Sequence, residues 1–472
     1  MIKISCSVDF FITYDKKFTS YNYFGQKSFV NTFRQRTNDE GQRTKNTMQF
    51  ANRLKFLQAN VFADMDRAKA DAALAGQNLI DLSLGSSDLL AAPHVVEAIA
   101  QSLHDPSTHG YLPFPGTQAF RQAAANWYTQ KFGIAIDPET EVLALIGSQE
   151  GTAHLPLAIL NPGDFALLLD PGYPSHAGGV YLANGQIYPM PLREENNFLP
   201  ILEEIPAPVL AQSRMMVLSY PHNPTAAIAP ISFFQQAVAF CQKHNLVLVH
   251  DFPYVDLVFE EETGKKRDGE AEAAEAAEAA NEEKSLADRR SLAPSILQAD
   301  PDKSVSIEFF TLSKSYNMGG FRVGYAIGNA KLIRALRQVK AAVDFNQYRG
   351  ILNGAIAALT GSQASVKTTV DTFRLRRDAF VNALHRIGWQ VPTPKATMYV
   401  WAKLPSTWAE DSIKFCTQLV ETTGVAASPG AGFGKFGEGY VRFALVHNPE
   451  ILKISVERIS QFLHSASDII QK

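Results

Sequence analysis

The sequence contains little cysteine, no large excess of charge of either sign and no long apolar run. Its three cysteines, Cys6, Cys241 and Cys416, lie far apart and match no metal-ligand spacing, which predicts a reduced, cytoplasmic protein. The formal net charge of -3 gives no reason to expect nucleic acid or an anionic membrane as a partner.

The N-terminus carries an apolar patch, Phe10, Phe11 and Ile12, that is flanked by Asp9 and Asp15. This patch is too short and too charged for a signal-peptide core or a membrane span. No other stretch is long enough to cross a bilayer, so we expect no membrane partner.

The length and composition are those of a chain that buries a large core. It has 472 residues, of which 46% are hydrophobic and 19% charged. The length allows about three domains, and one large α/β body with a smaller companion fits equally well.

Short β-rich runs alternate with helical segments through the middle of the chain. This order predicts an α/β fold with a mainly parallel sheet covered on both faces, in which ligands gather at the carboxyl ends of strands. Helices are expected at 93–103 and 118–132. The expected strands are 142–146, 165–169, 215–219, 246–250, 306–310 and 323–327, and 79–85 is a further short candidate.

The C-terminal part has a different order, with strands expected at 398–403, 425–428 and 440–444 and a helix at 449–463. This order predicts a smaller α+β domain. The expected division is therefore a large domain at 95–371 and a small domain formed by 48–94 and 372–472.

Two segments differ in composition from the rest. Residues 1–47 lack clear periodicity and are expected to be a poorly ordered extension, with Met48 as a hypothetical natural start. Residues 260–291 are rich in Glu and Ala without an apolar face, which predicts a solvated insertion.

The chain is organised around residues 311–324, which read Thr-Leu-Ser-Lys-Ser-Tyr-Asn-Met-Gly-Gly-Phe-Arg-Val-Gly. They lie between two strand-like runs, so Lys314 is expected on a turn where a sheet ends. A lone lysine is more often a surface residue. Here small hydroxyl residues, glycines and Arg322 surround it, and this set suits a phosphorylated aldehyde bound as a Schiff base.

This stretch resembles the pyridoxal-phosphate attachment site of the class I and II aminotransferases, in which a hydroxyl-x-Ser-Lys run precedes Asn-Met-x-Gly-x-Arg-x-Gly. Thr311 stands where Ser or Gly is usual and keeps a hydroxyl. The resemblance covers nearly everything after Met48 and is greatest to the LL-diaminopimelate, aspartate and alanine aminotransferases. It implies fold type I and pyridoxal 5'-phosphate as cofactor.

Such a cofactor needs an anion cradle, for which the sequence offers Gly-Ser-Gln-Glu-Gly at 147–151, before a helical segment. Backbone N–H groups at a helix N-terminus favour phosphate, and Ser148 and Gln149 would lie in the cradle. A hydroxyl from Thr311 or Ser313 would add a further contact. The alternative interpretation is an ordinary serine N-cap.

The cofactor ring needs a carboxylate, hydrogen-bond donors and a flat surface. Asp251 ends a strand and would keep the pyridine nitrogen protonated. Asn223 and Tyr254 would donate to the ring hydroxylate, and Tyr173 would stack on the ring. The Asn-Pro pair at 223 could also be a simple turn, and Tyr173 a plain packed residue.

Arg442 lies within an apolar strand, where an unpaired charge would be costly. A bidentate contact with a substrate carboxylate would satisfy it, and an internal salt bridge is the alternative.

The resemblance implies roles for these residues. Lys314 is the Schiff-base lysine, Asp251 and Tyr254 complete the catalytic set, Arg322 contacts the phosphate, and Arg442 binds the substrate carboxylate. Gly85 and Asn223 are further substrate contacts. Tyr111, in a Pro/Gly-rich loop, matches the tyrosine that in these enzymes reaches the phosphate of the neighbouring subunit, which implies a homodimer with shared sites.

The sequence departs from the family pattern at three further places. Ala226 follows Asn-Pro-Thr where Gly is usual, and Gly85-Ser86-Ser87-Asp88 stands at the entrance loop where Gly-x-Asp-Pro is common. The segment between Asp251 and Lys314 is lengthened by the 260–291 insertion. The amino donor is therefore left open.

The expected activity is transamination between an amino acid and a 2-oxo acid, plausibly 2-oxoglutarate, with ping-pong kinetics and Lys314 as proton shuttle. A carbon-sulfur β-lyase or a decarboxylase would use the same residues. A non-catalytic pyridoxal-binding regulator would need a DNA-binding module, which the N-terminal extension does not resemble.

Overall fold

The computed structural model describes residues 48–57, 61–259 and 292–470. The predicted N-terminal extension (1–47) and the Glu/Ala-rich insertion (260–291) lie outside the described residues. The chain from Ala51 onward forms one compact unit.

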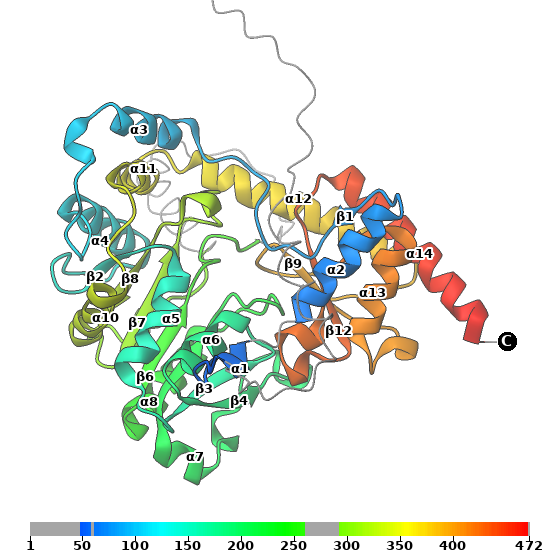
Figure 1. The fold of residues 1–472 in the computed structure, drawn as a ribbon, viewed down its shortest axis with the longest axis horizontal. Coiled ribbons are helices and arrows are strands. Elements are labelled where there is room, and N and C mark those ends of the chain that lie inside the picture. Colours follow the sequence, from blue (N-terminus) through cyan, green and yellow to red (C-terminus); the bar gives the residue numbers. More distant parts are fainter. Residues whose placement is uncertain (1–47, 58–60, 260–291, 471–472) are drawn as a thin grey trace, which may run out of the picture. The chain divides into compact units, whose positions relative to one another are not determined.

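A seven-stranded sheet is the centre of this unit (Figure 1). The strand order is β2-β8-β7-β6-β5-β3-β4, and the pairs from β4 across to β7 are parallel. Strand β8 runs antiparallel to both of its neighbours. The prediction of a mainly parallel sheet is confirmed. The strands are β2 (Val142–Leu145), β3 (Phe165–Asp170), β4 (Gln186–Pro191), β5 (Ser213–Leu218), β6 (Val247–Asp251), β7 (Ser306–Thr311) and β8 (Gly324–Gly328).

Helices cover both faces of this sheet because its strands are apolar on both sides. Along β3, Leu167 and Leu169 belong to one apolar cluster, and Ala166 and Leu168 belong to another. This alternation is the period of a strand buried between two layers.

The first cluster also takes in side chains of α3 (Pro93–Leu103), α4 (Gln118–Phe132), α8 (Ile231–His244) and α11 (Arg349–Thr360). The second takes in side chains of α5 (Ser148–Ile159), α6 (Pro174–Leu182) and α10 (Ala330–Val343). The short helix α7 (Ala207–Gln212) precedes β5.

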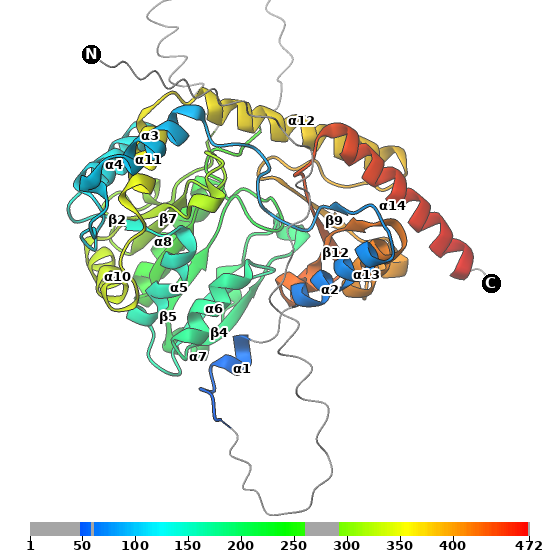
Figure 2. The ribbon, with the colours of Figure 1, turned by 45° about the horizontal axis from the view of Figure 1, so that its top comes forward.

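A third apolar cluster joins the two ends of the described chain. It contains Met65 of α2 (Val61–Leu74) together with Phe415 of α13 (Ser412–Thr423) and Val456 of α14 (Pro449–Ile470). In Figures 1 and 2, α2, α13 and α14 lie together beside β9 and β12, and α12 (Ala364–Arg386) runs from this group to the helices around the large sheet.

Two small sheets accompany this cluster, which confirms the predicted smaller α+β layer. Strands β9 (Tyr399–Lys403), β12 (Tyr440–Ala444) and β11 (Ser428–Pro429) form an antiparallel sheet in the order β11-β12-β9. Strand β1 (Ile80–Asp81) pairs in parallel with β10 (Val425–Ala426). Helix α1 (Leu54–Leu57) is a single turn.

Two local expectations were wrong, and one strand was missed. Residues 79–85 form a strand only at β1, and residues 425–428 divide into β10 and β11, which belong to different sheets. Strand β4 was not predicted, because it contains two prolines. It can form because it lies at the edge of the sheet, where a missing N–H is tolerated.

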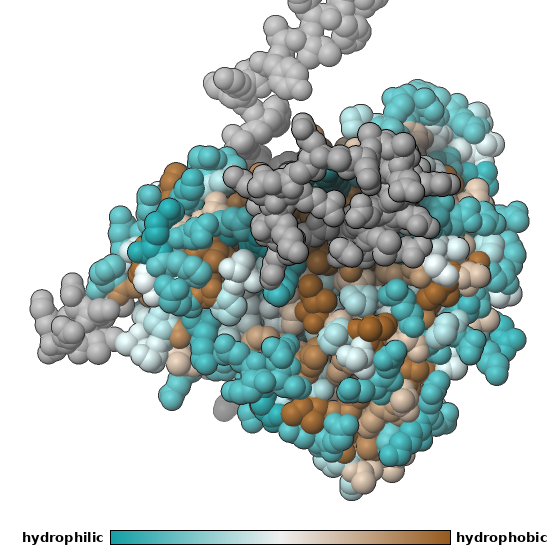
Figure 3. All heavy atoms as spheres, turned by 180° about the vertical axis from the view of Figure 1, so that it is seen from behind, coloured by the Kyte–Doolittle hydropathy of each residue, from teal (hydrophilic) through white to brown (hydrophobic). Residues whose placement is uncertain are grey.

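The surface of the described chain mixes hydrophilic and apolar residues on the face drawn in Figure 3. Within the described residues, no helix combines the length and the apolar character that a membrane crossing requires. Cys241 and Cys416 are buried free thiols.

Candidate functional site

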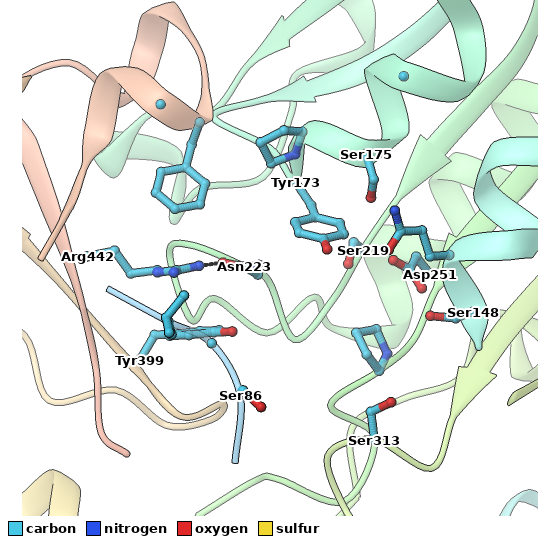
Figure 4. Close-up of a pocket in the computed structure, with 18 of the residues that line it drawn as sticks. Ser86, Ser148, Tyr173, Ser175, Ser219, Asn223, Asp251, Ser313, Tyr399 and Arg442 are labelled. Carbon is cyan, nitrogen blue, oxygen red and sulfur yellow. Dashed lines mark hydrogen bonds between the residues drawn. The ribbon is translucent and has the colours of Figure 1, made fainter. Parts of the chain in front are cut away.

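A cavity of about 1020 Å³ opens where strands β6 and β7 end and where the small antiparallel sheet faces them (Figure 4). Its position agrees with the expectation that ligands bind at the carboxyl ends of parallel strands. The predicted site residues that line it are Gly85, Ser148, Gln149, Tyr173, Asn223, Asp251, Tyr254, Thr311, Ser313, Lys314, Arg322 and Arg442.

Tyr111 does not line this cavity. Its side chain is 89% exposed, and its ring centre lies 5.2 Å from that of Phe345. A tyrosine at this position is accessible to another molecule, and its predicted role across a subunit interface stays a prediction.

Lys314 lies on the turn that follows β7, as predicted. Its Nζ donates to the carbonyl oxygen of Gly85 and lies 5.8 Å from the centre of the Tyr254 ring. The amine therefore enters the cavity from the strand end and meets the loop that follows β1.

Asp251 is the last residue of β6 and is buried. Its Oδ2 lies 3.0 Å from His176 Nε2, whereas its Oδ1 is buried without a partner within the described chain. An unsatisfied buried carboxylate oxygen is costly, so a protonated ring nitrogen is a fitting partner for it.

His176 was not predicted. It lies in α6, three residues after Tyr173, and the two rings meet edge to face at 5.7 Å. A histidine near the start of a helix has many structural explanations, so only its distance from Asp251 reveals a contribution to the site.

The predicted anion cradle lies at the start of α5. Gly147 precedes the helix with φ of +78°, and a Cβ there would lie 2.4 Å from Arg322 Nη2. Glycine therefore permits the guanidinium to approach the helix N-terminus, where the dipole also favours an anion. The alternative of a serine N-cap was wrong, because the N-cap is Gly147, and Ser148 is the first residue of the helix.

Two hydroxyl groups complete this end of the cavity. Thr311 Oγ1 and Ser313 Oγ lie 2.8 Å apart and both residues face the cavity. Hydroxyls, a helix N-terminus and a guanidinium together suit a phosphate.

Arg442 is buried on β12, with its guanidinium between two aromatic rings. The centres of the Tyr399 and Phe433 rings lie 4.4 and 4.7 Å from its Cζ. Its Nη1 donates to Asn223 Oδ1 at 2.9 Å, and its Nη2 donates to the Ser83 carbonyl at 2.6 Å.

None of the hydrogen-bond partners that Arg442 has within the described chain is a carboxylate. Its Nε is buried without a partner there. The internal salt bridge, which was the alternative interpretation, is therefore wrong, and the positive charge is available to an anionic ligand.

Tyr254 and Tyr399 form a buried pair at the cavity wall, with 2.8 Å between their hydroxyl oxygens. Burial raises the pKa of Tyr254 well above its ordinary value. Burial also acts to raise the pKa of Tyr399, but the charges of Lys314 and Arg442 and the contact with Tyr254 outweigh it and lower that pKa. Sequence reasoning missed Tyr399, because a tyrosine that opens an apolar strand is usually a core residue.

His222, next to Asn223, is fully buried and remains neutral. Burial, together with the neighbouring His176, lowers its pKa to about 3. Its Nδ1 lies 2.8 Å from Thr225 Oγ1, which holds the ring behind the cavity.

Together these groups fit pyridoxal phosphate. The cradle at α5 matches the phosphate, the free Oδ1 of Asp251 matches a pyridinium nitrogen, and Lys314 offers the amine that an aldehyde requires. Arg442 remains for a carboxylate.

Comparisons with known proteins agree with this arrangement. A family model described as aminotransferase class I and II matches residues 77–459. The chain is 38% identical over 419 residues to an LL-diaminopimelate aminotransferase of Dehalococcoides mccartyi, which covers 89% of this chain and 100% of that protein. It is 37% identical over 412 residues to an LL-diaminopimelate aminotransferase of Halothermothrix orenii, with coverage of 87% and 98%.

Solved structures give similar results. Substrate-bound BacF of Bacillus subtilis is 33% identical with a TM-score of 0.79, and covers 88% of this chain and 98% of that chain. A probable N-succinyldiaminopimelate aminotransferase of Thermus thermophilus is 39% identical with a TM-score of 0.75, with coverage of 85% and 99%.

Proposed function

The chain belongs to the class I and II aminotransferases, and from this membership we propose that it moves an amino group from an amino acid to 2-oxoglutarate by a ping-pong reaction. It is a pyridoxal-phosphate-dependent enzyme of fold type I. The observation that supports the proposal best is the presence of Lys314, Asp251 and Arg442 in the wall of one cavity.

Pyridoxal phosphate, when bound, supplies an electron-withdrawing ring that stabilises negative charge at the substrate carbon. In the proposed mechanism Asp251 would keep the ring nitrogen protonated, and His176 holds the Asp251 carboxylate in place. The phosphate would be held by Ser148, Gln149, Thr311, Ser313 and Arg322.

The remaining residues act on the substrate and on its proton. Arg442 binds the substrate carboxylate with the help of Asn223, which fixes the guanidinium by accepting from Nη1. Lys314 Nζ would move the proton at the substrate carbon, a task that contributes typically about 10²–10⁴-fold in rate. Tyr173 would pack against the cofactor ring, and Tyr254 would donate to its ring oxygen.

For the amino donor, we propose a dicarboxylic diamino acid of the LL-diaminopimelate type. The relatives at 37–38% identity bear that name. The cavity wall also carries Lys69 and Asp66, whose ammonium and carboxylate lie 2.8 Å apart, and Lys69 Nζ also contacts the Asp81 carboxylate at 3.2 Å. Such a pair suits the distal ammonium and carboxylate of this donor.

A panel of amino donors tests the proposal. Each donor is added with 2-oxoglutarate, and glutamate, 2-oxo acid, pyruvate and ammonia are measured, with Lys314→Ala as the inactive control. We expect stoichiometric glutamate and 2-oxo acid, fastest with LL-diaminopimelate. Pyruvate with ammonia would identify a β-lyase instead, and fastest turnover of a small monocarboxylic donor would overturn the donor assignment.

The proposal includes a cytoplasmic homodimer in which Tyr111 contacts the phosphate of the neighbouring subunit. It also includes the division into a large domain (95–371) and a small domain (48–94 with 372–472). Separate apolar clusters support this division, since Val366 of α12 packs in the first cluster and Phe373 packs in the third.

A further inference from the structure

Tyr254 and Tyr399 share one hydrogen bond, and this bond constrains what Tyr254 can do. A phenol carries a single proton and can donate only once. If Tyr254 donates to the ring oxygen of the cofactor, its proton is no longer available for Tyr399, and the bond between the two hydroxyls requires Tyr399 as the donor.

We propose that Tyr399 is a positioning residue of this site, which donates its hydrogen bond to Tyr254 and thereby directs the proton of Tyr254 toward the cofactor. The inference depends on the proposed function, because it assigns Tyr254 to the ring oxygen. It adds a hydrogen-bond relay of two phenols that begins in β9 and ends at the cofactor.

The acidities of the two phenols favour this direction. The more acidic of two phenols is the better donor, and the less acidic one is the better acceptor. Burial acts to raise the pKa of Tyr399, but the charges of Lys314 and Arg442 and the contact with Tyr254 lower it. Burial and the contact with Tyr399 raise the pKa of Tyr254 well above its usual value; Arg442 acts to lower that pKa and Tyr173 to raise it.

Two contacts fix the position of Tyr399. The first is Gly85, where a Cβ would lie 2.1 Å from the Tyr399 hydroxyl, so only glycine leaves the space that this hydroxyl occupies. The carbonyl of Gly85 also accepts from Lys314 Nζ, so the same residue holds the amine and admits the phenol.

The second contact is Arg442, whose guanidinium lies 4.4 Å from the centre of the Tyr399 ring. Tyr399 pairs with Ala444 across β9 and β12, so Arg442 is its diagonal neighbour on the same face of the sheet. The Tyr399 ring thus packs against the Arg442 guanidinium, and its hydroxyl bonds Tyr254. These two contributions can be separated by mutation.

Tyr399→Phe removes the hydroxyl and keeps the ring against Arg442. A donor to the ring oxygen stabilises the deprotonated form of the bound cofactor, so a weaker donor should raise the pH at which its absorbance changes. For the holoenzyme of Tyr399→Phe we expect an upward shift of about half a pH unit, with the KM for amino acids little changed. Tyr254→Phe should shift the same midpoint further.

The double variant distinguishes a relay from two independent effects. Because Tyr399 acts through Tyr254, adding Tyr399→Phe to Tyr254→Phe should produce no further shift. Tyr220→Phe is the matched control: Tyr220 is buried, bonds the Phe198 carbonyl, does not line the cavity, and should leave the midpoint unchanged.

An unchanged midpoint in Tyr399→Phe would overturn the relay and leave the hydroxyl with a packing role. Equal shifts in the presence and absence of the Tyr254 hydroxyl would overturn it as well. Failure of the proposed function would look different, because it would appear in the products of the donor panel, as pyruvate and ammonia, and would leave the titration of the bound cofactor intact.

Discussion

At the scale of single residues, Arg442 shows how a buried charge can be kept available for a ligand. Its neighbours hold the guanidinium through a carbonyl, an amide, a hydroxyl and two ring faces, and none of them neutralises it. The substrate carboxylate is expected to do so.

Replacing Arg442 with lysine should therefore weaken substrate binding selectively. Lysine keeps the charge but loses the planar fork, so we expect the KM for amino donors to rise by about 10- to 100-fold. Cofactor affinity, measured by equilibrium dialysis, should stay within a factor of about two, since Arg442 is not assigned to the cofactor. Loss of cofactor with an unchanged KM would contradict the assignment.

His222 predicts a pH dependence of stability. Its pKa is about 3 in the folded protein and about 6.5 in an unfolded chain, so below pH 6.5 the unfolded state binds a proton that the folded state does not. The free energy of unfolding that neutral His222 contributes is fully present above pH 6.5 and decreases as the pH falls toward 3. Between pH 7 and pH 5 the loss is about 2 kcal/mol.

His222→Asn removes this titration, and asparagine can replace Nδ1 as partner of Thr225. The midpoint of thermal unfolding should therefore fall less between pH 7 and pH 5 in the variant than in the wild type. Parallel curves for the two proteins would show that His222 is not held neutral.

At the scale of elements, Asp170 connects the end of β3 to the loop of residues 430–437. Its carboxylate accepts from the backbone N–H groups of Lys435 and Phe436, at 3.2 and 2.9 Å. Gly172 N donates to the Phe433 carbonyl at 2.8 Å, close to the ring that packs on Arg442. Asp170 therefore positions the loop whose Phe433 ring packs against the Arg442 guanidinium.

Asp170→Ala should raise the KM for amino donors by about tenfold with little effect on cofactor affinity. Asp170→Asn retains one acceptor oxygen, so its KM should lie between those of the wild type and Asp170→Ala. Asp300 is the matched control, because its carboxylate likewise accepts backbone N–H groups, from Ser304 and Val305, but does not line the cavity. Asp300→Asn should lower the stability of the fold without changing the KM for amino donors. An equal rise in KM for Asp170→Ala and Asp300→Asn would remove the specific role of Asp170.

The elements also show what the sequence could and could not reveal. The helices expected at 93–103 and 118–132 match α3 and α4 to the residue, and the strand ends placed Asp251 and Lys314 at one edge of the sheet. A local sequence pattern does not show which other segment a strand pairs with. For this reason the segment 79–85 was predicted as a strand, although only β1 pairs, and Ser83, Leu84 and Gly85 line the cavity.

The residues that sequence reasoning missed share one property. His176 and Tyr399 acquire their contribution from a contact with a side chain far away in the sequence, Asp251 in one case and Tyr254 in the other. Residue type and spacing predict groups that touch a ligand, because the chemistry of the ligand restricts them. Residue type and spacing do not predict the groups that contact those residues without touching the ligand.

At the scale of the whole molecule, Tyr111 predicts that two chains share each site. Mixed dimers of Tyr111→Phe chains with Lys314→Ala chains test this prediction. In such a dimer the site that retains Lys314 would receive Tyr111 from the other chain, so it should bind cofactor with wild-type affinity. The Tyr111→Phe homodimer should bind it about tenfold more weakly, through loss of one hydrogen bond to phosphate. Equally weak binding in the mixed dimer would show that Tyr111 acts within its own chain, and wild-type affinity in the Tyr111→Phe homodimer would show that it does not act at all.

The central claim is that one amine, that of Lys314, holds the cofactor covalently. Reduction of the purified holoenzyme with borohydride, followed by peptide mass spectrometry, locates that bond directly. The account predicts a pyridoxyl group on the peptide that contains Lys314, and none in Lys314→Ala. A modified lysine elsewhere in the chain, or no modification of the wild-type protein, would contradict it.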